Sequence, residues 1–405
     1  MDGRAIIIGA GQAGAQGAAS MRQAGFAGEI VMFGEEAEPP YQRPPLSKAY
    51  LQGELDAGRL YLRPAAFYDQ QKIDLRLGVR VASIDPAAKI VRTSAGQTLS
   101  YENLLIATGA PPRRLNCPGA DLPGVHYLRT IADSDALRPV LKQGGRIVII
   151  GAGYIGLEVA ASARKAGLNV TVLEMADRVL ARVAGREISD FFESVHRAHG
   201  VDLRLGAALD HFEGMGRVET AVLKTGEKIP ASAVLVGVGA APAIALAEAA
   251  GLKIENGIST DERARTSDPS VFAAGDCASH PSPIYGRRMR LESVPNAIEQ
   301  AKVAGTNMAG GNAIYDAVPW FWSDQYDVKL QTVGVSEGAD ETVLRGDPAS
   351  RKFSVWYLKD ARLLAVDAVN DPAAFAVSKR LIAAKSAPDA KVLADPARDL
   401  KSLLS

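Results

Sequence analysis

The chain has few cysteines, no excess of either charge and no long apolar run. Cys117 and Cys277 are its two cysteines, and they form no C-x-x-C pair or metal-spaced cluster. Lys plus Arg and Asp plus Glu number 46 each, so no overall field attracts nucleic acid or an anionic membrane. No stretch reaches the roughly 18 apolar residues of a membrane span, and the N-terminus lacks a secretory signal pattern. These absences predict a cytoplasmic protein with no metal site and no nucleic-acid or membrane partner.

The N-terminal segment has the alternation of a βαβ unit, within a chain of 405 residues that is long enough for two or three domains. Residues 5–8 are apolar and predict a strand, and a glycine-rich turn follows at residues 9–14. Residues 15–25 predict a helix and residues 29–33 a second strand. Because a crossover helix joins parallel strands, this segment predicts a parallel sheet.

The first turn carries the glycine spacing of a dinucleotide-binding loop. Gly9 permits the tight bend, Gly11 lets a pyrophosphate approach the backbone, and Gly14 lets helix and strand pack closely. The helix N-terminus then offers N–H groups and a positive dipole end to the phosphates. Glu35 or Glu36 ends the second strand, where a carboxylate accepts hydrogen bonds from the adenosine ribose.

The same pattern recurs in the middle of the chain. Residues 146–150 predict a strand, residues 151–156 a glycine turn, residues 157–167 a helix and residues 170–174 another strand. Gly151, Gly153 and Gly156 repeat the spacing of the first loop, which indicates an internal duplication.

Glu174 closes the second unit and bears on the choice of nicotinamide. An acid at this position binds a free ribose 2′-hydroxyl and repels a 2′-phosphate, which favours NADH over NADPH. Arg178 lies close in sequence and weakens that preference. One glycine loop by itself can be an ordinary turn of an α/β protein, but two complete copies predict two dinucleotides. FAD in one site and a nicotinamide in the other is the combination that allows hydride transfer.

Five further segments carry a resemblance to a known family. They are residues 41–48 (YQRPPLSK), 127–130 (YLRT), 274–278 (AGDCA), 292–297 (ESVPNA) and 319–326 (PWFWSDQY). With the two glycine units, they make the whole chain resemble the NADH-dependent, FAD-containing ferredoxin reductases of bacterial cytochrome P450 and aromatic-ring dioxygenase systems.

The resemblance implies an α/β fold of the glutathione reductase type. Two Rossmann-like dinucleotide-binding domains are expected, followed by a C-terminal α+β domain. Residues 1–112 and 240–315 would form a discontinuous FAD-binding domain, residues 113–239 the NAD-binding domain, and residues 316–405 the C-terminal interface domain.

The resemblance also implies which residues contact FAD. Lys48 would be a fixed cation near the flavin N5–O4 edge, or simply a solvated lysine. Asp276 would bind ribityl hydroxyls or cap the next helix. Arg129 would bind the adenine end or a phosphate, or form a surface salt bridge. Val294 begins a predicted helix whose N-terminus would face the flavin N1–C2=O edge. The full set is Gly9, Gly11, Ala13, Gly14, Glu35, Arg43, Lys48, Val81, Ala107, Thr108, Gly109, Arg129, Asp276, Val294, Pro295, Ala297 and Trp322.

A second set is implied for the nicotinamide. Tyr154 and Ile155 would cover the flavin until the nicotinamide displaces them. Glu158 would hydrogen-bond the carboxamide, or else be a first-turn acid that favours the helix dipole. Trp322 would lie beside the flavin, unless it only packs with Trp320 and Phe321. Lys48, Glu158 and Trp322 are thus the catalytic candidates. The NAD set is Gly151, Gly153, Tyr154, Ile155, Gly156, Glu158, Glu174 and Gly239.

The cysteines separate this chain from other flavoproteins of similar fold. Relatives that reduce disulfides or peroxides have cysteine near the FAD loop, whereas residues 41–48 contain none. Cys277 is expected to be a small buried residue. Two cysteines cannot hold an iron–sulfur cluster, so the metal centre must belong to a partner.

The expected reaction is hydride transfer from NADH to FAD, followed by single-electron transfers to a [2Fe–2S] ferredoxin that supplies a cytochrome P450 or dioxygenase. A monomer or weak dimer is expected. Two alternatives stay open: an NADH-binding flavoprotein resembling apoptosis-inducing factor, or a reductase for rubredoxin or a Rieske acceptor. Ferredoxins of this kind are usually acidic, so a basic docking patch is expected. Its candidates are Arg287, Arg288, Arg290, Lys302 and Lys379.

Overall fold

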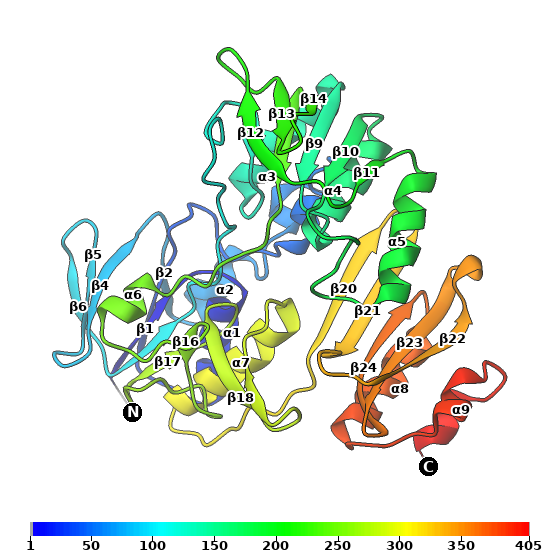
Figure 1. Ribbon diagram of the computed structural model, residues 1–405. Coiled ribbons are helices and arrows are strands. Elements are labelled where there is room, and N and C mark those ends of the chain that lie inside the picture. The colour runs from blue at the N-terminus through cyan, green and yellow to red at the C-terminus, as the bar shows by residue number, and fades with distance from the viewer. Residues whose placement is uncertain (1–2, 405) are drawn as a thin grey trace. The chain divides into compact units, whose positions relative to one another are not determined.

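The computed structural model describes residues 3–404 (Figure 1). By internal packing the chain divides into two compact units. The first comprises Met1–Gln42, Leu60–Pro111 and Ala241–Phe321, and the second comprises Arg43–Arg59, Pro112–Ala240 and Trp322–Ser405. The three-domain division expected from the sequence stays a prediction.

A five-stranded parallel sheet forms the centre of the first unit, in the order β17-β7-β1-β2-β3. The chain proceeds from β1 to β2 and β3 on one side and later adds β7 and β17 on the other, so the strand order reverses beside β1. Ligands of open α/β sheets bind at the carboxyl ends of strands at such a reversal. The strands are β1 (Arg4–Ile8), β2 (Glu29–Phe33), β3 (Ile73–Arg76), β7 (Asn103–Ile106) and β17 (Val271–Ala273).

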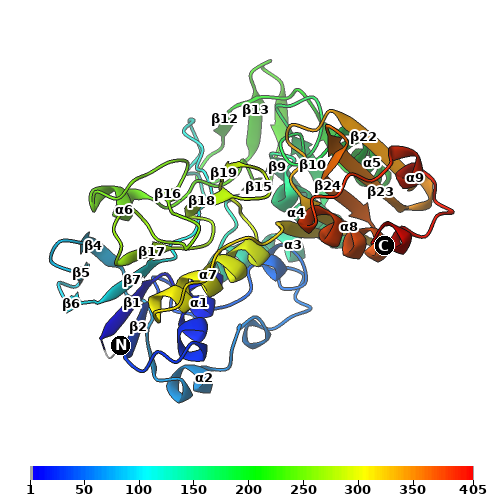
Figure 2. The ribbon, with the colours of Figure 1, turned by 90° about the horizontal axis from the view of Figure 1, so that it is seen from below.

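Helices α1 (Gln12–Gln23) and α7 (Val294–Met308) lie side by side on this sheet (Figure 2). Their approach depends on glycine, because a Cβ added to Gly305 would lie 2.5 Å from the Gly17 carbonyl oxygen. A Cβ added to Gly17 would in turn lie 2.5 Å from Leu105. Alternate residues of β1 point to opposite faces, so the sheet is buried on both sides.

Smaller elements complete the first unit. One antiparallel sheet consists of β4 (Val81–Asp85), β5 (Ile90–Thr93) and β6 (Thr98–Ser100). Another sheet consists of β16 (Ile258–Ser259), β18 (Ala278–Ser282) and β19 (Arg287–Met289). The remaining helices are α2 (Ala65–Gln70) and α6 (Ala245–Ala249).

The second unit repeats the parallel-sheet design, in the order β11-β10-β9-β15-β8. Its strand order reverses beside β9, as it does beside β1 in the first unit. The strands are β8 (Val125–His126), β9 (Arg146–Ile150), β10 (Asn169–Leu173), β11 (Asp202–Arg204) and β15 (Ala233–Val236). The helices are α3 (Ile131–Gln143), α4 (Tyr154–Lys165) and α5 (Arg186–Ala198), and a small antiparallel sheet contains β12 (Leu209–Glu213), β13 (Thr220–Leu223) and β14 (Lys228–Pro230).

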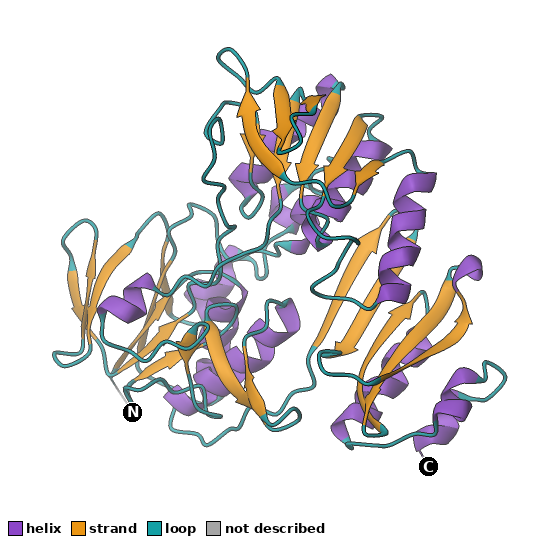
Figure 3. Cartoon of the chain, viewed as in Figure 1, coloured by secondary structure: helices purple, strands orange, loops and turns teal. Residues whose placement is uncertain are grey.

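The end of the chain forms a five-stranded antiparallel sheet in the order β20-β21-β24-β23-β22. Its strands are β20 (Trp320–Gln325), β21 (Val328–Gly334), β22 (Glu341–Asp347), β23 (Lys352–Lys359) and β24 (Arg362–Val369). Helix α8 (Pro372–Ala383) packs on β21 and β24, and the short α9 (Ala390–Ala394) packs on β22 (Figure 3).

The predicted α/β fold class is confirmed, and the main differences concern helices. The two helices that follow the glycine loops, α1 and α4, begin three residues before their predicted starts, at Gln12 and Tyr154. The reason is that each helix starts directly after the second glycine, so the third glycine lies inside the helix. Helices α3 and α5 were not predicted at all. In residues 3–404 no helix is both long enough and apolar enough to cross a bilayer.

Candidate functional site

The first glycine loop lies at the strand-order reversal of the first unit. Gly9 has φ of 113°, and a Cβ there would lie 2.2 Å from the Ala107 carbonyl oxygen. A Cβ on Gly14 would lie 1.9 Å from the Gly9 carbonyl oxygen. Gly11 is the N-cap of α1, and a Cβ there would meet none of the described atoms within 4 Å. The loop therefore leaves open space at Gly11, where a pyrophosphate would approach the N-terminus of α1.

The second loop repeats this geometry in the second unit. Gly151 has φ of 99°, and its Cβ would lie 2.6 Å from the Gly237 carbonyl oxygen. A Cβ on Gly156 would lie 2.2 Å from the Gly151 carbonyl oxygen, whereas one on Gly153 would meet none of the described atoms within 4 Å. Gly239, with φ of 98°, belongs to the same edge, after β15. Both loops thus fit a dinucleotide pyrophosphate.

The acids behind the two loops are held differently. Glu174 accepts the Ala152 N–H on Oε2 at 2.7 Å and the Ala176 N–H on Oε1 at 2.9 Å. These two bonds fix its carboxylate beside the glycine loop, where a ribose hydroxyl would bind. Glu35 is 73% exposed and lies 3.9 Å from Arg80. Of the two acids considered at the first loop, Glu36 receives the Tyr41 hydroxyl, which leaves Glu35 as the better ribose candidate.

Residues from three segments of the first unit meet around Gly275. A Cβ added there would lie 3.1 Å from the Ala13 Cβ and 3.7 Å from the Ala297 Cβ, so α1 and α7 both approach this turn. The Gly275 N–H donates to Gln300 Oε1 at 2.8 Å. Asp276 follows directly and is positioned through its carbonyl, which accepts from Arg290 at 3.1 Å.

The other FAD candidates of this unit lie at strand and helix ends. Thr108 follows β7 and donates its hydroxyl to the Ala243 carbonyl at 2.9 Å, and Gly109 has φ of 71°. Val81 is a buried residue that begins β4. At the start of α7, Ser293 accepts the Asn296 N–H at 3.2 Å. Pro295 has no N–H, and the Asn296 and Ala297 N–H groups donate to Ser293, so few N–H groups of this turn are left for a ligand.

Arg43 and Arg129 are brought together in the second unit. The Arg43 Nη1 donates to the Arg129 carbonyl at 2.7 Å, and the Arg129 N–H donates to Asp133 at 3.0 Å. Asp133 and Thr130 form the capping box of α3. The Arg43 side chain is therefore held by a main-chain carbonyl, and Arg129 is held through its own main-chain N–H and carbonyl.

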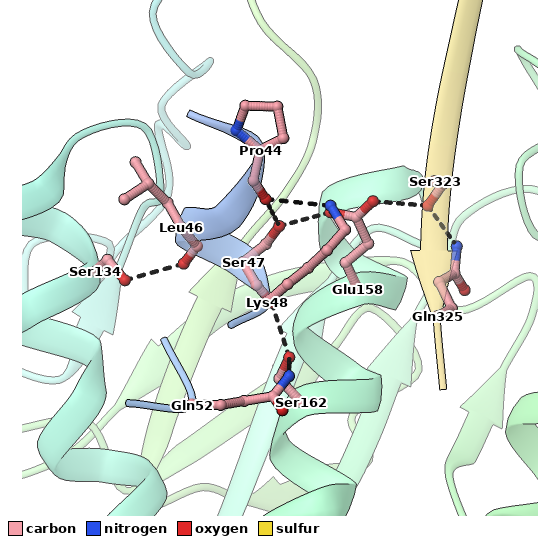
Figure 4. Close-up of polar contacts among 10 residues, drawn as sticks. All are labelled: Pro44, Leu46, Ser47, Lys48, Gln52, Ser134, Glu158, Ser162, Ser323 and Gln325. Carbon is pink, nitrogen blue, oxygen red and sulfur yellow. Dashed lines mark hydrogen bonds and ion pairs between the residues drawn. The ribbon is translucent and has the colours of Figure 1, made fainter. Parts of the chain in front are cut away.

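Glu158 is the centre of a buried polar cluster (Figure 4). It is 5% exposed, and Lys48 Nζ lies 2.7 Å from its Oε2. Ser47 donates to Oε2 at 2.5 Å and Ser323 donates to Oε1 at 2.6 Å. Because α4 begins at Tyr154, Glu158 lies in the second turn, and its reading as a first-turn dipole acid is wrong. Lys48 also donates to the Pro44 carbonyl at 3.2 Å, so it is not simply a solvated lysine.

The loop that carries Lys48 is attached to two helices. Ser162 of α4 donates to the Ser47 carbonyl at 2.8 Å, and Ser134 of α3 donates to the Leu46 carbonyl at 2.9 Å. The sequence assigned no chemistry to Ser47 or Ser323. Their partners lie 111 and 165 residues away, so local sequence carries no signal of the contact.

Tyr154, Ile155 and Trp322 differ in how far their side chains are buried. The Tyr154 hydroxyl is buried and hydrogen-bonds the Thr332 side chain, and burial raises its pKa, although part of the residue stays accessible. Thr332 donates to Asp367 at 2.5 Å, which ties Tyr154 to the C-terminal sheet. Ile155 is 45% exposed. Trp322 is half-buried on β20. Of the two residues expected to cover the flavin, Ile155 has the freer side chain.

The cysteines and the basic candidates complete the comparison with the sequence. The prediction that Cys277 is buried is confirmed, and burial raises the pKa of its thiol. Arg288 donates to the Thr260 and Ser279 carbonyls, and Arg290 to the Asp276 carbonyl. These two guanidinium groups therefore support the fold. Lys302 is half-exposed and pairs with Glu299 at 2.8 Å.

Comparison with known proteins agrees with this geometry. The sequence model described as pyridine nucleotide-disulphide oxidoreductase matches residues 3–301, and the one described as reductase C-terminal matches residues 320–404. A ferredoxin–NAD(P)(+) reductase of a Sphingomonas species is 46% identical over 403 residues, which cover 99% of this chain and 97% of that protein. A rubredoxin–NAD(+) reductase of Pseudomonas putida is 39% identical over 368 residues, which cover 91% and 96%.

A solved structure is also similar over the full chain. The crystal structure of the covalent putidaredoxin reductase–putidaredoxin complex has a TM-score of 0.97 and 42% identity, covering 99% of this chain and 98% of that one. The chain therefore belongs to the pyridine nucleotide-disulphide oxidoreductase family, among its ferredoxin reductases, whose cofactors are FAD and NAD(H).

Proposed function

We propose that the protein takes electrons from NADH through FAD and delivers them singly to a [2Fe–2S] ferredoxin, which supplies a cytochrome P450 or a ring-hydroxylating dioxygenase. The observation that carries the proposal is the presence of two pyrophosphate cradles in one chain, together with an ion pair at 2.7 Å between Lys48 and the buried Glu158 carboxylate. Bound FAD supplies hydride acceptance and single-electron release, which no side chain offers. The protein supplies binding, orientation and electrostatics.

Each dinucleotide has its own set of residues in this proposal. Gly9, Gly11 and Gly14 cradle the FAD pyrophosphate and Glu35 binds its ribose. Lys48 provides a positive charge for the flavin edge that becomes negative on reduction, and Trp322 excludes water from the same edge. The remaining FAD candidates support these contacts from the strand and helix ends described above.

On the nicotinamide side, Gly151, Gly153 and Gly156 bind the pyrophosphate and Glu174 binds the ribose. The Glu158 carboxylate accepts the N–H of the carboxamide and so orients the ring for transfer. Ile155, with the more accessible side chain, yields to the entering ring, whereas Tyr154 is anchored through its hydroxyl. No side chain needs to donate or remove a proton in the hydride step.

The acceptor is proposed to be a separate protein. The chain has two cysteines, fewer than the four that a [2Fe–2S] cluster usually requires. Both described cysteines are free, which suits the reducing cytoplasm that we propose as its compartment. A monomer or weak dimer is the assembly we propose.

Stopped-flow reduction of the purified holoprotein tests the nicotinamide half of the proposal. NADH should bleach the flavin absorbance at least about tenfold faster than NADPH at equal concentration, because Glu174 repels a 2′-phosphate. Equal or faster reduction by NADPH would contradict the role of Glu174. Slow reduction by both, without turnover, would favour the alternative of an NADH-binding flavoprotein.

Steady-state turnover tests the acceptor half. The measurement is NADH-dependent cytochrome c reduction with a bacterial [2Fe–2S] ferredoxin or with a rubredoxin as mediator. The rubredoxin reductase similar to this chain makes rubredoxin the second candidate. The ferredoxin should give the higher kcat/KM, and a higher value with rubredoxin would replace it as the proposed partner.

A further inference from the structure

A chain of hydrogen bonds continues from Glu158 through Ser323 to other buried residues of the second unit. Ser323 Oγ lies 2.6 Å from Glu158 Oε1, and Gln325 Nε2 lies 3.2 Å from Ser323 Oγ (Figure 4). Gln325 Oε1 lies 2.8 Å from His196 Nε2 on α5. The Tyr326 hydroxyl lies 3.4 Å from His196 Nδ1 and forms the weak outer end.

The first links are built by strand geometry. Ser323 and Gln325 are two residues apart on β20, so their side chains lie on one face, and both are buried. Asp324 stands between them on the opposite face, where it is 41% exposed and lies 3.9 Å from Lys329. His196 is completely buried. The PWFWSDQY segment thus combines an internal polar pair with one outward acid.

Hydrogen-bonding capacity fixes the direction of every link. An ionised Glu158 only accepts, so the single hydroxyl hydrogen of Ser323 points to it. Ser323 Oγ must then accept from Gln325, which requires the amide nitrogen on that side. The Gln325 oxygen is left to accept, so His196 must carry its hydrogen on Nε2. The Nδ1 of His196 is then an acceptor for the Tyr326 hydroxyl.

The surroundings of His196 agree with this assignment. Burial lowers the pKa of His196 to about 4, so the ring is neutral near pH 7 and has one donor and one acceptor nitrogen. Nearby, His199 stacks on Tyr326 with ring centroids 3.7 Å apart and holds the outer end of the chain in place. All donors therefore point toward Glu158, and hydrogen bonds aligned in one direction strengthen one another.

We propose that Ser323, Gln325 and His196 are positioning residues that orient the Glu158 carboxylate and keep it a hydrogen-bond acceptor toward the nicotinamide carboxamide. This inference rests on the proposed function of Glu158. The chain orients and does not conduct protons, because the Gln325 amide does not readily pass a proton along. It also gives a chemical reason for Ser323 and Gln325, two residues of the PWFWSDQY segment that had no predicted role.

Kinetics of flavin reduction in a set of variants test the coupling. Ser323→Ala should lower the limiting rate of reduction by NADH about tenfold, the effect of losing a hydrogen bond to a charged group. Gln325→Leu removes the neutral hydrogen bond that holds Ser323, so it should lower the same rate by less, about threefold. The double variant should be no slower than the slower single one, because either change cuts the same chain. In a Glu158→Gln background, both substitutions should change the rate less than about twofold.

Asp324→Asn is the matched control, since it alters the same strand on the opposite face and should leave the limiting rate unchanged. Additive losses in the double variant, or equal losses with and without Glu158, would overturn the proposal in favour of general destabilisation. Slow reduction of the wild-type holoprotein would instead count against the proposed function. Flavin content and Tm of each variant identify any that fail to fold.

A direct measurement on the wild-type holoprotein decides the matter if the variants lose FAD. In ¹⁵N-histidine spectra near pH 7, His196 should be protonated on Nε2 and unprotonated on Nδ1. The chain has five histidines, so loss of one signal set in His196→Gln assigns it. A hydrogen on Nδ1 alone, or a doubly protonated ring, would break the required direction and overturn the proposal.

Discussion

At the residue scale, the glycines of each dinucleotide-binding loop are required for two different reasons. The third glycine of each loop is required for packing within the protein. A Cβ on Gly156, for example, would lie 2.2 Å from the Gly151 carbonyl oxygen. The second glycine has space around it, and a Cβ on Gly153 would meet none of the described atoms within 4 Å. Gly153 has φ of −79°, which any residue adopts. Its lack of a side chain therefore serves the ligand.

This difference predicts opposite results for two similar substitutions. Gly153→Ala should keep Tm within about 2 °C of wild type but raise the half-saturating NADH concentration about tenfold, because its methyl group occupies the pyrophosphate path. Gly156→Ala should destabilise the protein by about 2 kcal/mol or more, since helix and strand must separate. Thermal unfolding and stopped-flow titration measure the two effects. A similar loss of Tm in both variants would show that both glycines are structural.

At the element scale, the C-terminal sheet anchors two helices of the parallel-sheet part of its unit. Asp367 on β24 receives the Thr332 hydroxyl at 2.5 Å and the Tyr357 hydroxyl at 2.8 Å. Thr332 in turn holds Tyr154 at the start of α4, and Tyr357 accepts the Gly185 N–H at 3.3 Å at the start of α5. One buried carboxylate thereby connects helices α4 and α5 to the C-terminal sheet.

The burial of Asp367 predicts a pH-dependent stability. Burial outweighs the two hydroxyl donors and raises the pKa of Asp367 to about 6, from about 4 in an unfolded chain. The folded state then holds a proton that the unfolded state has released, so stability falls as pH rises from about 4 to about 6 and is level above. A pKa difference of about two units changes the free energy of unfolding by at most about 3 kcal/mol.

Asp367→Asn should remove this slope. Its Tm relative to wild type should increase as pH rises from about 4 to about 6 and stay constant above that range. The variant also loses one acceptor, so a pH-independent offset is expected in the same comparison. A Tm difference between the two proteins that does not vary between pH 4 and 7 would contradict the buried, titrating carboxylate.

At the scale of the whole molecule, local pattern predicted the two sheets and the cradles but not the contacts that complete the site. Strands such as β1 and β9 are apolar runs followed at once by glycine, so adjacent residues carry the signal. Helix α3 was missed because Pro139 lies inside it. Helix α5 was missed although Ile188, Phe191, Phe192 and Val195 have helical spacing, a signal that was available.

The Glu158 cluster was beyond any local pattern. The resemblance predicts Glu158 as a nicotinamide contact, but its partners come from β20 and from the loop of Ser47. Only the folded chain brings these segments together. The role of Glu158 therefore stays a prediction, while the hydroxyl groups that hold its carboxylate required the structure.

The charge balance of the whole chain predicts how a partner is attracted. With 46 residues of each sign, any steering of an acidic ferredoxin must come from a local group. Of the basic candidates, Arg288 and Arg290 donate to main-chain carbonyls, whereas Lys302 is half-exposed and forms an ion pair with Glu299. Lys302→Glu should lower kcat/KM for the ferredoxin about three- to tenfold at low ionic strength. The loss of kcat/KM should shrink at about 0.3 M salt, where screening is strong.

The control is Lys253→Glu, which also reverses an exposed lysine that pairs with a nearby glutamate and should have little effect on kcat/KM. If the two variants behave alike, or if Lys302→Glu leaves both kcat/KM and its salt dependence unchanged, the ferredoxin does not dock over Lys302.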